Sequence, residues 1–443
     1  MAAIITGCIE QQRLKVKRIS TQRSEMLGHY DFIVGTFSTP TLLTLRFVPQ
    51  SEERATSGSL TVHKQHKAIG SHSWLILSKD KRYLYATAWT SPPRIAAYEL
   101  FQGDDLKLIG TARTRSRSGY VCASDTHVYS AGGASGEVFM LDKRTGSFLS
   151  PRIVNGATDN RQSIDVAPLQ TLSFLEDHSQ RDDGSVMDFG GLRHGAHSAD
   201  LSPDGRLLYI ADIGRNCIWT YKISATGGRQ QHLRLASKTI SPRPHDGPRH
   251  VHPHPSGKII YCLQEHSGIV DVFEVGQSVS EDMTSTTLRH IQAVPTIPAD
   301  ADCRDFWADE VRTSLSDGHA PKWLYASTRG LSESQKGYVS VYALNADGLI
   351  VDAPIIDTHR RSEKPAHAAV RAMYQTATSG GWANAIQPGP TLNGTEFIAM
   401  TDSEVGYVFV LSWDGTAIKE AARVNLNDGN RGGKHGAATA IWL

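Results

Sequence analysis

The fold is decided by a stretch that reads Gly195-Ala196-His197-Ser198-Ala199-Asp200-Leu201-Ser202-Pro203-Asp204-Gly205-Arg206-Leu207-Leu208-Tyr209-Ile210-Ala211-Asp212. It consists of an apolar strand, a tight Pro-Asp-Gly turn, a second strand and an acidic residue at the end of that strand. The same design returns over residues 249–265, with a turn at Pro255-Ser256-Gly257 and an acid at Glu265. A strand–turn–strand unit that recurs along a chain predicts a repeat architecture.

Similar strand patterns follow one another from His29 to the end of the chain. They are rich in β-branched and aromatic residues and are separated by Asp-Gly, Ser-Gly and Asn-Gly turns, whereas helical periodicity is nearly absent. Each unit spans roughly 50 residues, as propeller blades of four strands do. The sequence therefore predicts an all-β fold, a seven-bladed β-propeller of four-stranded antiparallel blades. The two chain ends share one blade and close the ring, which removes free sheet edges.

The predicted domain organisation is a single propeller over residues 29–443, preceded by an N-terminal extension or edge strand over residues 1–28. Two long polar stretches, residues 156–190 and 276–320, are predicted as loops between blades, and residues 309–314 as one helical turn within the second.

Composition limits the classes of partner. The net charge of the 443 residues is +1, so no global field attracts nucleic acid or a membrane surface. No apolar run reaches the roughly 20 residues that span a bilayer. The five cysteines form no Cys-x-x-Cys pair, and Cys217 and Cys262 lie within strand patterns, which favours reduced core residues and a cytoplasmic location. We expect a small-molecule ligand, and the sequence leaves a homo-oligomer open.

Candidate site residues follow from the repeat register. The innermost strand of each propeller blade lines the axial channel, so residues at one fixed distance before the turns should form a ring. The residues six positions before a turn are Ser73, His197, Arg249 and Trp382. A second ring is predicted at the ends of the following strands, from Asp212, Glu265, Arg329 and Asp402.

His197, Arg249, Glu265 and Arg329 are thus expected to converge, although they are distant in sequence. An imidazole, two guanidinium groups and a carboxylate in one concave site are suited to acid–base chemistry on a polyanionic substrate. The planar fork of arginine matches carboxylates. The alternative interpretation is structural: His197 is a satisfied strand residue, Glu265 neutralises Arg249, and Asp212 caps a turn.

A histidine-rich run over residues 244–254 raises the question of a metal site. His250, His252 and His254 would share one strand face. Because prolines interrupt the strand and no nearby pair of carboxylates completes a site, the sequence predicts no metal.

Several segments resemble the fungal carboxy-cis,cis-muconate cyclases, which are lactonase-type seven-bladed propellers related to a bacterial 6-phosphogluconolactonase group. The segments are Gly35-Thr36-Phe37-Ser38-Thr39-Pro40, Gly195-Ala196-His197, Pro248-Arg249, Ser327-Thr328-Arg329, Thr378-Ser379-Gly380-Gly381 with Asn384-Ala385, and Ala440-Ile441-Trp442.

The resemblance implies that His197, Glu265, Arg249 and Arg329 are catalytic. It also implies a cofactor-free cycloisomerisation of a carboxylate-bearing diene such as 3-carboxy-cis,cis-muconate. One carboxylate adds to a conjugated double bond and closes a γ-lactone, while the adjacent carbon receives a proton from His197 or Glu265. The two arginines would offset the charge of the trianion.

Trp382 departs from the family pattern, which has a histidine at this place, and this predicts a bulkier or more apolar substrate. The residues expected to bind substrate are Ser73, Asp212, Trp382, Asn384 and Asp402. Three alternatives remain open at this stage: a lactone hydrolase, a ring-forming cyclase recruited to secondary metabolism, and a non-enzymatic propeller that binds a partner.

Overall fold

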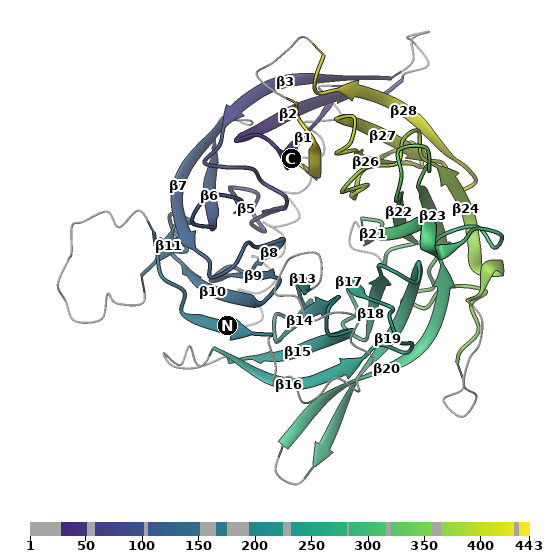
Figure 1. Cartoon of the computed structure of the whole chain (residues 1–443), viewed down its shortest axis with the longest axis horizontal. Helices are drawn as coiled ribbons and strands as arrows, with labels where there is room; N and C mark the ends of the chain where they lie inside the picture. The colour runs from purple at the N-terminus through teal and green to yellow at the C-terminus, as the bar shows by residue number, and fades with distance from the viewer. Residues whose placement is uncertain are drawn as a thin grey trace, which may run out of the picture.

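The computed structural model describes ten segments of the chain: residues 28–50, 58–101, 105–150, 165–174, 195–224, 232–280, 283–315, 320–356, 365–428 and 434–443. Within them, seven antiparallel sheets surround one axis (Figure 1). Six are four-stranded and one is five-stranded, because an extra strand pairs with its blade. The predicted all-β, seven-bladed propeller is therefore confirmed.

The strands of the blades, each blade in its order across the sheet, are these. The first blade holds β29 (Ala437–Trp442), β1 (Tyr30–Thr36), β2 (Thr41–Val48) and β3 (Ser59–Lys67), and the second β4 (Leu75–Leu77), β5 (Tyr83–Ala88), β6 (Arg94–Phe101) and β7 (Asp105–Arg113). The third holds β8 (Tyr120–Ala123), β9 (His127–Gly132), β10 (Ser135–Leu141) and β11 (Phe148–Leu149), and the extra strand β12 (Gln170–Ser173) also pairs with β10. The fourth holds β13 (Ala196–Leu201), β14 (Leu207–Asp212), β15 (Cys217–Ile223) and β16 (Leu233–Ile240), and the fifth β17 (Pro248–Pro253), β18 (Ile259–Gln264), β19 (Ile269–Ser280) and β20 (Met283–Pro295). The sixth holds β21 (Phe306–Thr313), β22 (Trp323–Gly330), β23 (Tyr338–Ala343) and β24 (Val370–Gln375), and the seventh β25 (Ile386–Leu392), β26 (Thr395–Thr401), β27 (Tyr407–Trp413) and β28 (Ile418–Asn425).

The chain ends close the ring, as the sequence predicts. The last strand, β29, pairs antiparallel with β1, with Val34 opposite Ala440. The indole of Trp442 packs on Phe32 with 4.5 Å between ring centroids and donates to the carbonyl of Gln387 in the seventh blade. The closure therefore ties the first blade to its neighbour as well as pairing the two termini.

The second strand of each blade is buried on both faces because adjacent blades pack against it. All six residues of β14 except Leu207 are buried, and all six of β18 are. Strands covered on two sides read as continuous apolar runs. Cys217 and Cys262 are both fully buried, in agreement with the prediction that they are core residues.

The prediction of a loop over residues 276–320 is wrong. The segment contains the outer part of β19, all of β20 and all of β21, and the β19–β20 ribbon extends well beyond the blade (Figure 1). Residues 309–313 therefore belong to strand β21, and the predicted helical turn over 309–314 is wrong. The polar composition misled the prediction because β21 faces the channel, where charged side chains replace apolar ones.

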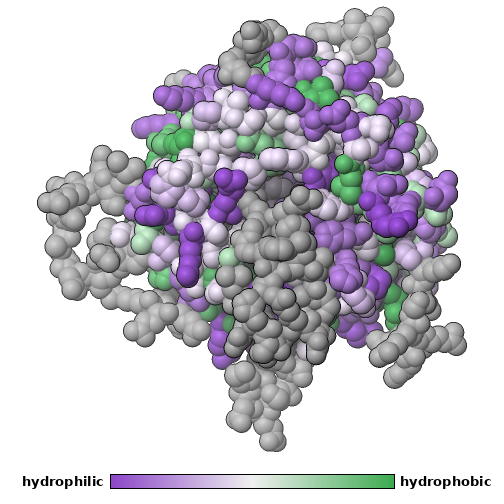
Figure 2. All heavy atoms as spheres, viewed as in Figure 1, coloured by the Kyte–Doolittle hydropathy of each residue, from purple (hydrophilic) through white to green (hydrophobic). Residues whose placement is uncertain are grey.

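The other predicted loop, residues 156–190, is described only over residues 165–174, which include β12. The predicted extension over residues 1–28 lies outside the described residues except for Gly28. In the part of the chain that the structure describes, no helix has the length and apolar character needed to cross a membrane. Figure 2 shows hydrophilic residues over most of the described surface on one face, with hydrophobic residues in small separate groups.

Candidate active site

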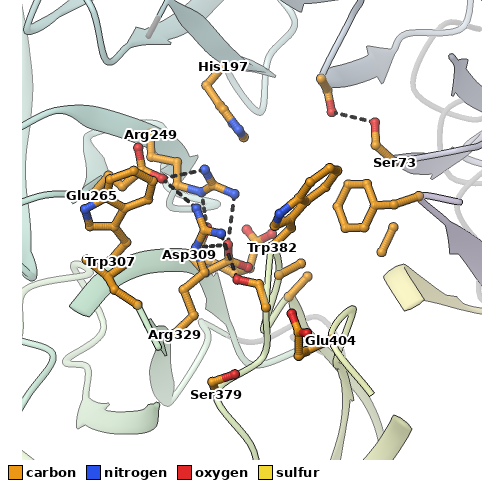
Figure 3. Close-up of a pocket in the computed structure, with 18 of the residues that line it drawn as sticks. Ser73, His197, Arg249, Glu265, Trp307, Asp309, Arg329, Ser379, Trp382 and Glu404 are labelled. Atoms are coloured by element: carbon orange, nitrogen blue, oxygen red, sulfur yellow. Dashed lines mark hydrogen bonds and ion pairs between the residues drawn. The ribbon is translucent and has the colours of Figure 1, made fainter. Parts of the chain in front are cut away.

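A cavity of about 850 Å³ opens where the innermost strands begin. Its lining contains residues from all seven blades: Ala438, Ser73, Gly119, His197, Arg249, Asp309 and Ala385. This places the cavity on the propeller axis. Six of the sequence-predicted site residues line it together: Ser73, His197, Arg249, Glu265, Arg329 and Trp382 (Figure 3).

Three lining residues occupy equivalent positions on consecutive blades. His197 on β13, Arg249 on β17 and Asp309 on β21 each lie at a break in the register with the next strand. A β-bulge leaves one residue out of the ladder and turns its side chain in a new direction. The three bulges therefore explain how side chains separated by more than fifty positions reach one cavity.

The two guanidinium groups are paired with two carboxylates. Nη1 and Nη2 of Arg249 lie 2.8 Å from Oε1 of Glu265 and 2.8 Å from Oδ1 of Asp309, respectively. Nη2 of Arg329 lies 3.3 Å from the same Glu265 oxygen, and its Nε lies 3.8 Å from Oδ1 of Asp309. All four residues are buried. These distances agree with the structural alternative, in which Glu265 neutralises Arg249.

The guanidinium groups nevertheless keep donors for a ligand. Arg249 also donates through Nε to the carbonyl of Asp309, and Arg329 donates through Nη1 to the carbonyl of Gly381. A guanidinium carries five N–H donors. Counting bonds among the described residues, each guanidinium retains at least two donors, which suffices for a substrate carboxylate.

His197 enters the cavity from β13 above the ion pairs (Figure 3). Burial, followed by the positive charge of Arg249, lowers the pKa of His197 well below its usual value, so its imidazole is neutral at physiological pH. Its Nδ1 is buried and has no hydrogen-bond partner among the described residues. A neutral ring next to two cations can accept a proton, and an anion bound to those cations would favour its protonated form.

Aromatic rings form the opposite part of the lining. Phe37 lies 5.3 Å from Trp89 and 5.8 Å from Trp382, measured between ring centroids, and the guanidinium of Arg117 covers Trp89 at 5.0 Å. Trp382 is 64% exposed. We call Phe37, Trp89 and Trp382 the aromatic side of the cavity.

We call the opposite group the charged side; it consists of His197, Arg249, Glu265, Asp309 and Arg329. Figure 3 shows the indole of Trp382 across the cavity from the ion pairs.

Three residues predicted to bind substrate lie outside the lining. Asp212 accepts bonds from the backbone N–H of Arg215 and from Nε1 of Trp219. Asp402 accepts bonds from the backbone N–H groups of Glu404 and Val405. Their carboxylates follow a strand end, as predicted, but they are fully buried and hold the tight turns that come next.

The third, Asn384, supports the segment that carries Trp382. It is fully buried and donates to the carbonyl of Thr328 at 3.0 Å. Gly380 has a φ of +91°, and a Cβ there would lie 2.4 Å from Asn384. Only glycine fits this approach without displacing the amide. Asn384 therefore positions the Gly380–Trp382 turn from behind.

The sequence interpretation missed Asp309 and Trp307, both on β21. Asp309 completes the ion-pair group, and the ring of Trp307 lies under Arg329 with 5.1 Å from the guanidinium carbon to the ring centroid. Asp309 lies six residues before Leu315, the same spacing that identifies His197 and Arg249. Because no Pro-Gly or Asp-Gly turn marks residues 313–315, the count was not applied there.

The histidine-rich run does not gather its imidazoles in one place. Nδ1 of His250 lies 2.8 Å from Glu310, Nε2 of His252 lies 3.0 Å from Thr313, and Nδ1 of His254 lies 2.9 Å from Ser256. Among the described residues, no three His, Cys, Asp or Glu side chains are grouped as metal ligands.

Comparison with known proteins places this site in a family context. Residues 32–361 match the family described as "Lactonase, 7-bladed beta-propeller". The chain is 39% identical over 390 residues to "Muconate cycloisomerase 1" of Cutaneotrichosporon cutaneum, which covers 87% of this chain and 90% of that protein. It is 27% identical over 255 residues to the "Carboxy-cis,cis-muconate cyclase" of Neurospora crassa, which covers 56% of this chain and 60% of that protein.

A solved structure shares the fold at lower identity. The periplasmic gluconolactonase PpgL of Pseudomonas aeruginosa superimposes with a TM-score of 0.65 at 18% identity, over 94% of this chain and 99% of that one.

Proposed function

Because the chain belongs to the lactonase family of seven-bladed β-propellers, we propose that it is an intramolecular lactonising cycloisomerase that acts on a diene dicarboxylate of the muconate class. The observation that carries the proposal is the pair of guanidinium groups beside a neutral imidazole in one axial cavity. A carboxylate that must attack a double bond of its own molecule needs positioning, and a pair of arginine forks supplies it.

In this mechanism Arg249 and Arg329 bind the attacking carboxylate through their remaining N–H donors. The carboxylate oxygen forms a bond to one alkene carbon, and the π electrons move to the neighbouring carbon, which takes a proton. His197 delivers this proton. Burial and then the positive charge of Arg249 lower the pKa of its imidazole, and a bound dianion offsets that charge and favours the protonated ring. Glu265 and Asp309 hold the guanidinium groups in place.

The aromatic side indicates which substrates fit. A cavity of about 850 Å³ is larger than muconate needs and falls among sites for larger ligands, ~300–1,000 Å³. An exposed tryptophan at the rim offers a stacking surface. We therefore infer that the substrate carries an apolar or aryl substituent distant from the attacking carboxylate.

The test is a turnover assay without added metal or nucleotide. With cis,cis-muconate, 3-carboxymuconate and an aryl-substituted muconate, the ultraviolet absorbance of the conjugated diene should decline. In deuterated water the lactone should carry a single deuterium, on the carbon next to the new C–O bond. Unchanged absorbance with all three dienes at high enzyme concentration would refute the proposal.

Lactone hydrolysis is a second candidate, and the neutral state of His197 favours it, because a neutral imidazole can take a proton from water. The curated relatives include a 6-phosphogluconolactonase of Enterobacter, 26% identical over 298 residues. Proton release from a lactone, measured with a pH indicator, would identify this activity, whereas cycloisomerisation consumes a proton.

A further inference from the structure

Beneath the charged side lies a second layer of buried polar residues that the proposed mechanism does not use. It begins with His250 and Glu310, which follow directly after the bulge residues Arg249 and Asp309 and also line the cavity. His250 is 2% exposed and Glu310 is fully buried. Nδ1 of His250 lies 2.8 Å from Oε1 of Glu310.

This layer connects to the reacting end of the cavity. The rings of His197 and His250 lie 5.2 Å apart between centroids. Nδ1 of His197, Nε2 of His250 and Oε2 of Glu310 are all buried without a partner among the described residues. Buried polar atoms are rarely left unpaired, and such exceptions often mark sites of catalysis.

The charges of the layer do not balance if every carboxyl group is ionised. Arg312 lies 3.2 Å from Glu310 and 4.0 Å from Asp200, and no other cation pairs with these two carboxyl groups among the described residues. Arg312 also donates to the hydroxyl of Tyr120, which in turn donates to Asp200. One guanidinium compensates one carboxylate, so a buried second carboxylate favours its neutral form.

The titration of the two acids agrees with this count. Burial raises the pKa of Glu310 to about 7 and that of Asp200 to about 7, although Arg312 opposes both shifts. Arg249 also opposes the shift of Glu310. Burial lowers the pKa of His250 well below the usual value, and it does the same for His252, whose Nδ1 lies 3.2 Å from Arg312, so both imidazoles stay neutral.

We propose that the His250–Glu310 pair is a proton store that recharges His197, with Arg312 and Asp200 setting how firmly it holds its proton. The inference rests on the proposed function, because lactonisation takes up one proton in each turnover.

A proton passes from Glu310 through His250 to His197. When the new C–O bond forms, the neighbouring carbon takes a proton from the ring of His197. His197 regains a proton from Nε2 of His250, whose Nδ1 receives the proton of the Glu310 carboxyl. A solvent proton then binds Nε2 of His250 and the Nδ1 proton returns to Glu310, which restores both groups and leaves no net charge in the site.

The decisive variant is Glu310→Gln, which keeps the size of the side chain and removes the acid. We expect kcat to fall by about 10²–10³-fold with KM nearly unchanged. The decline of wild-type kcat as the pH rises through about 7, where Glu310 loses its proton, should be absent in the variant. The matched control is Glu137→Gln, a buried carboxyl group on β10 that is bonded to Ser130 and Ser135 and lies outside the cavity. It should retain kcat and the wild-type pH profile.

A second variant separates a proton store from a structural role. Asp200→Asn leaves Arg312 with one carboxylate to compensate, so Glu310 should ionise more readily and the alkaline decline of kcat should move to lower pH. A loss of kcat below about threefold in Glu310→Gln, or an unmoved decline in Asp200→Asn, would overturn the inference.

A substrate-free measurement keeps this inference distinct from the proposed function. In infrared difference spectra of the wild type against Glu310→Gln, a protonated carboxyl band should be present below neutral pH and vanish above it. If the band titrates this way while no diene is consumed, the proposed function is refuted. The proposal that His250 and Glu310 store a proton is then still supported. If dienes are consumed and no such band exists, the store is refuted.

Discussion

On the charged side of the cavity the arginine and carboxylate side chains are buried and paired with one another, whereas on the aromatic side Trp382 is 64% exposed and Phe37 is its only ring contact among the described residues. The charged side is preorganised, so its groups need not move to meet a substrate. Trp382 therefore keeps most of its ring surface free for a ligand. Under the proposed function, the charged side would carry the chemistry and the aromatic side the choice of substrate.

The largest effect is expected from Arg249→Met. This change leaves Glu265 and Asp309 buried with one shared cation, and removing one partner of a buried ion pair costs about 3–5 kcal/mol of unfolding free energy. kcat/KM should fall by at least ~10²-fold, since positioned donors are lost. Denaturant unfolding and steady-state kinetics measure both quantities.

The control is Arg289→Met, which breaks the exposed pair with Glu274. Its stability should stay within about 0.5 kcal/mol of the wild type. If Arg249→Met were equally harmless, the charged side would not be a preorganised unit.

His197→Asn should reduce kcat by about 10²–10⁴-fold while leaving the ion pairs in place. It should also alter the acid stability of the protein. Unfolded histidine titrates near 6.5 and native His197 well below, so between these values the unfolded state binds a proton that the native state does not. Stability is therefore lost as the pH falls through this window, by up to about 1.4 kcal/mol per pH unit.

Unfolding free energies measured from pH 7 downward test this expectation. The curve of His197→Asn should fall less steeply than that of the wild type. Parallel curves would show that the imidazole is not held neutral.

Trp382→Ala tests the aromatic side. With an aryl-substituted diene, kcat/KM should fall by about 10- to 100-fold, because stacking and apolar burial are lost. Unsubstituted muconate should be affected less than about threefold. Phe101→Ala, an exposed ring outside the cavity, is the control and should change neither substrate. Equal losses for both dienes would contradict a role in substrate choice.

The smallest effect on activity is expected from Asp402→Ala. The carboxylate bonds two backbone N–H groups of the turn after β26, so its loss should cost about 1–3 kcal/mol of stability. kcat and KM should stay within about twofold of the wild type. A marked rise of KM would instead show that Asp402 contributes to substrate binding.

The sequence is sufficient for the fold because the turn signals repeat. Pro203-Asp204-Gly205 and Pro255-Ser256-Gly257 fix the register of two consecutive blades, and counting back from them brings His197 and Arg249 to one cavity. The same regularity predicts that Glu265 and Arg329 lie nearby, and their shared ion pair agrees.

The remaining errors have a physical origin. A strand end predicts where Asp212 and Asp402 are in the chain but not whether their carboxylates point into the channel or fold back onto the next turn. Asp309 was overlooked because no Pro-Gly or Asp-Gly turn marks residues 313–315 after its strand, so the sequence offers no point from which to count its register. Which arginine pairs with which carboxylate depends on tertiary packing, so the local sequence does not determine the pairing.

The three bulges place His197, Arg249 and Asp309 outside the strand ladders of their blades. A residue outside the ladder can be exchanged without repairing a strand pairing, so the positions of His197, Arg249 and Asp309 are open to substitution while the blades stay intact. A propeller built in this way can acquire a new reaction through a few matched replacements at one rim, and the strand pairings of its blades are kept.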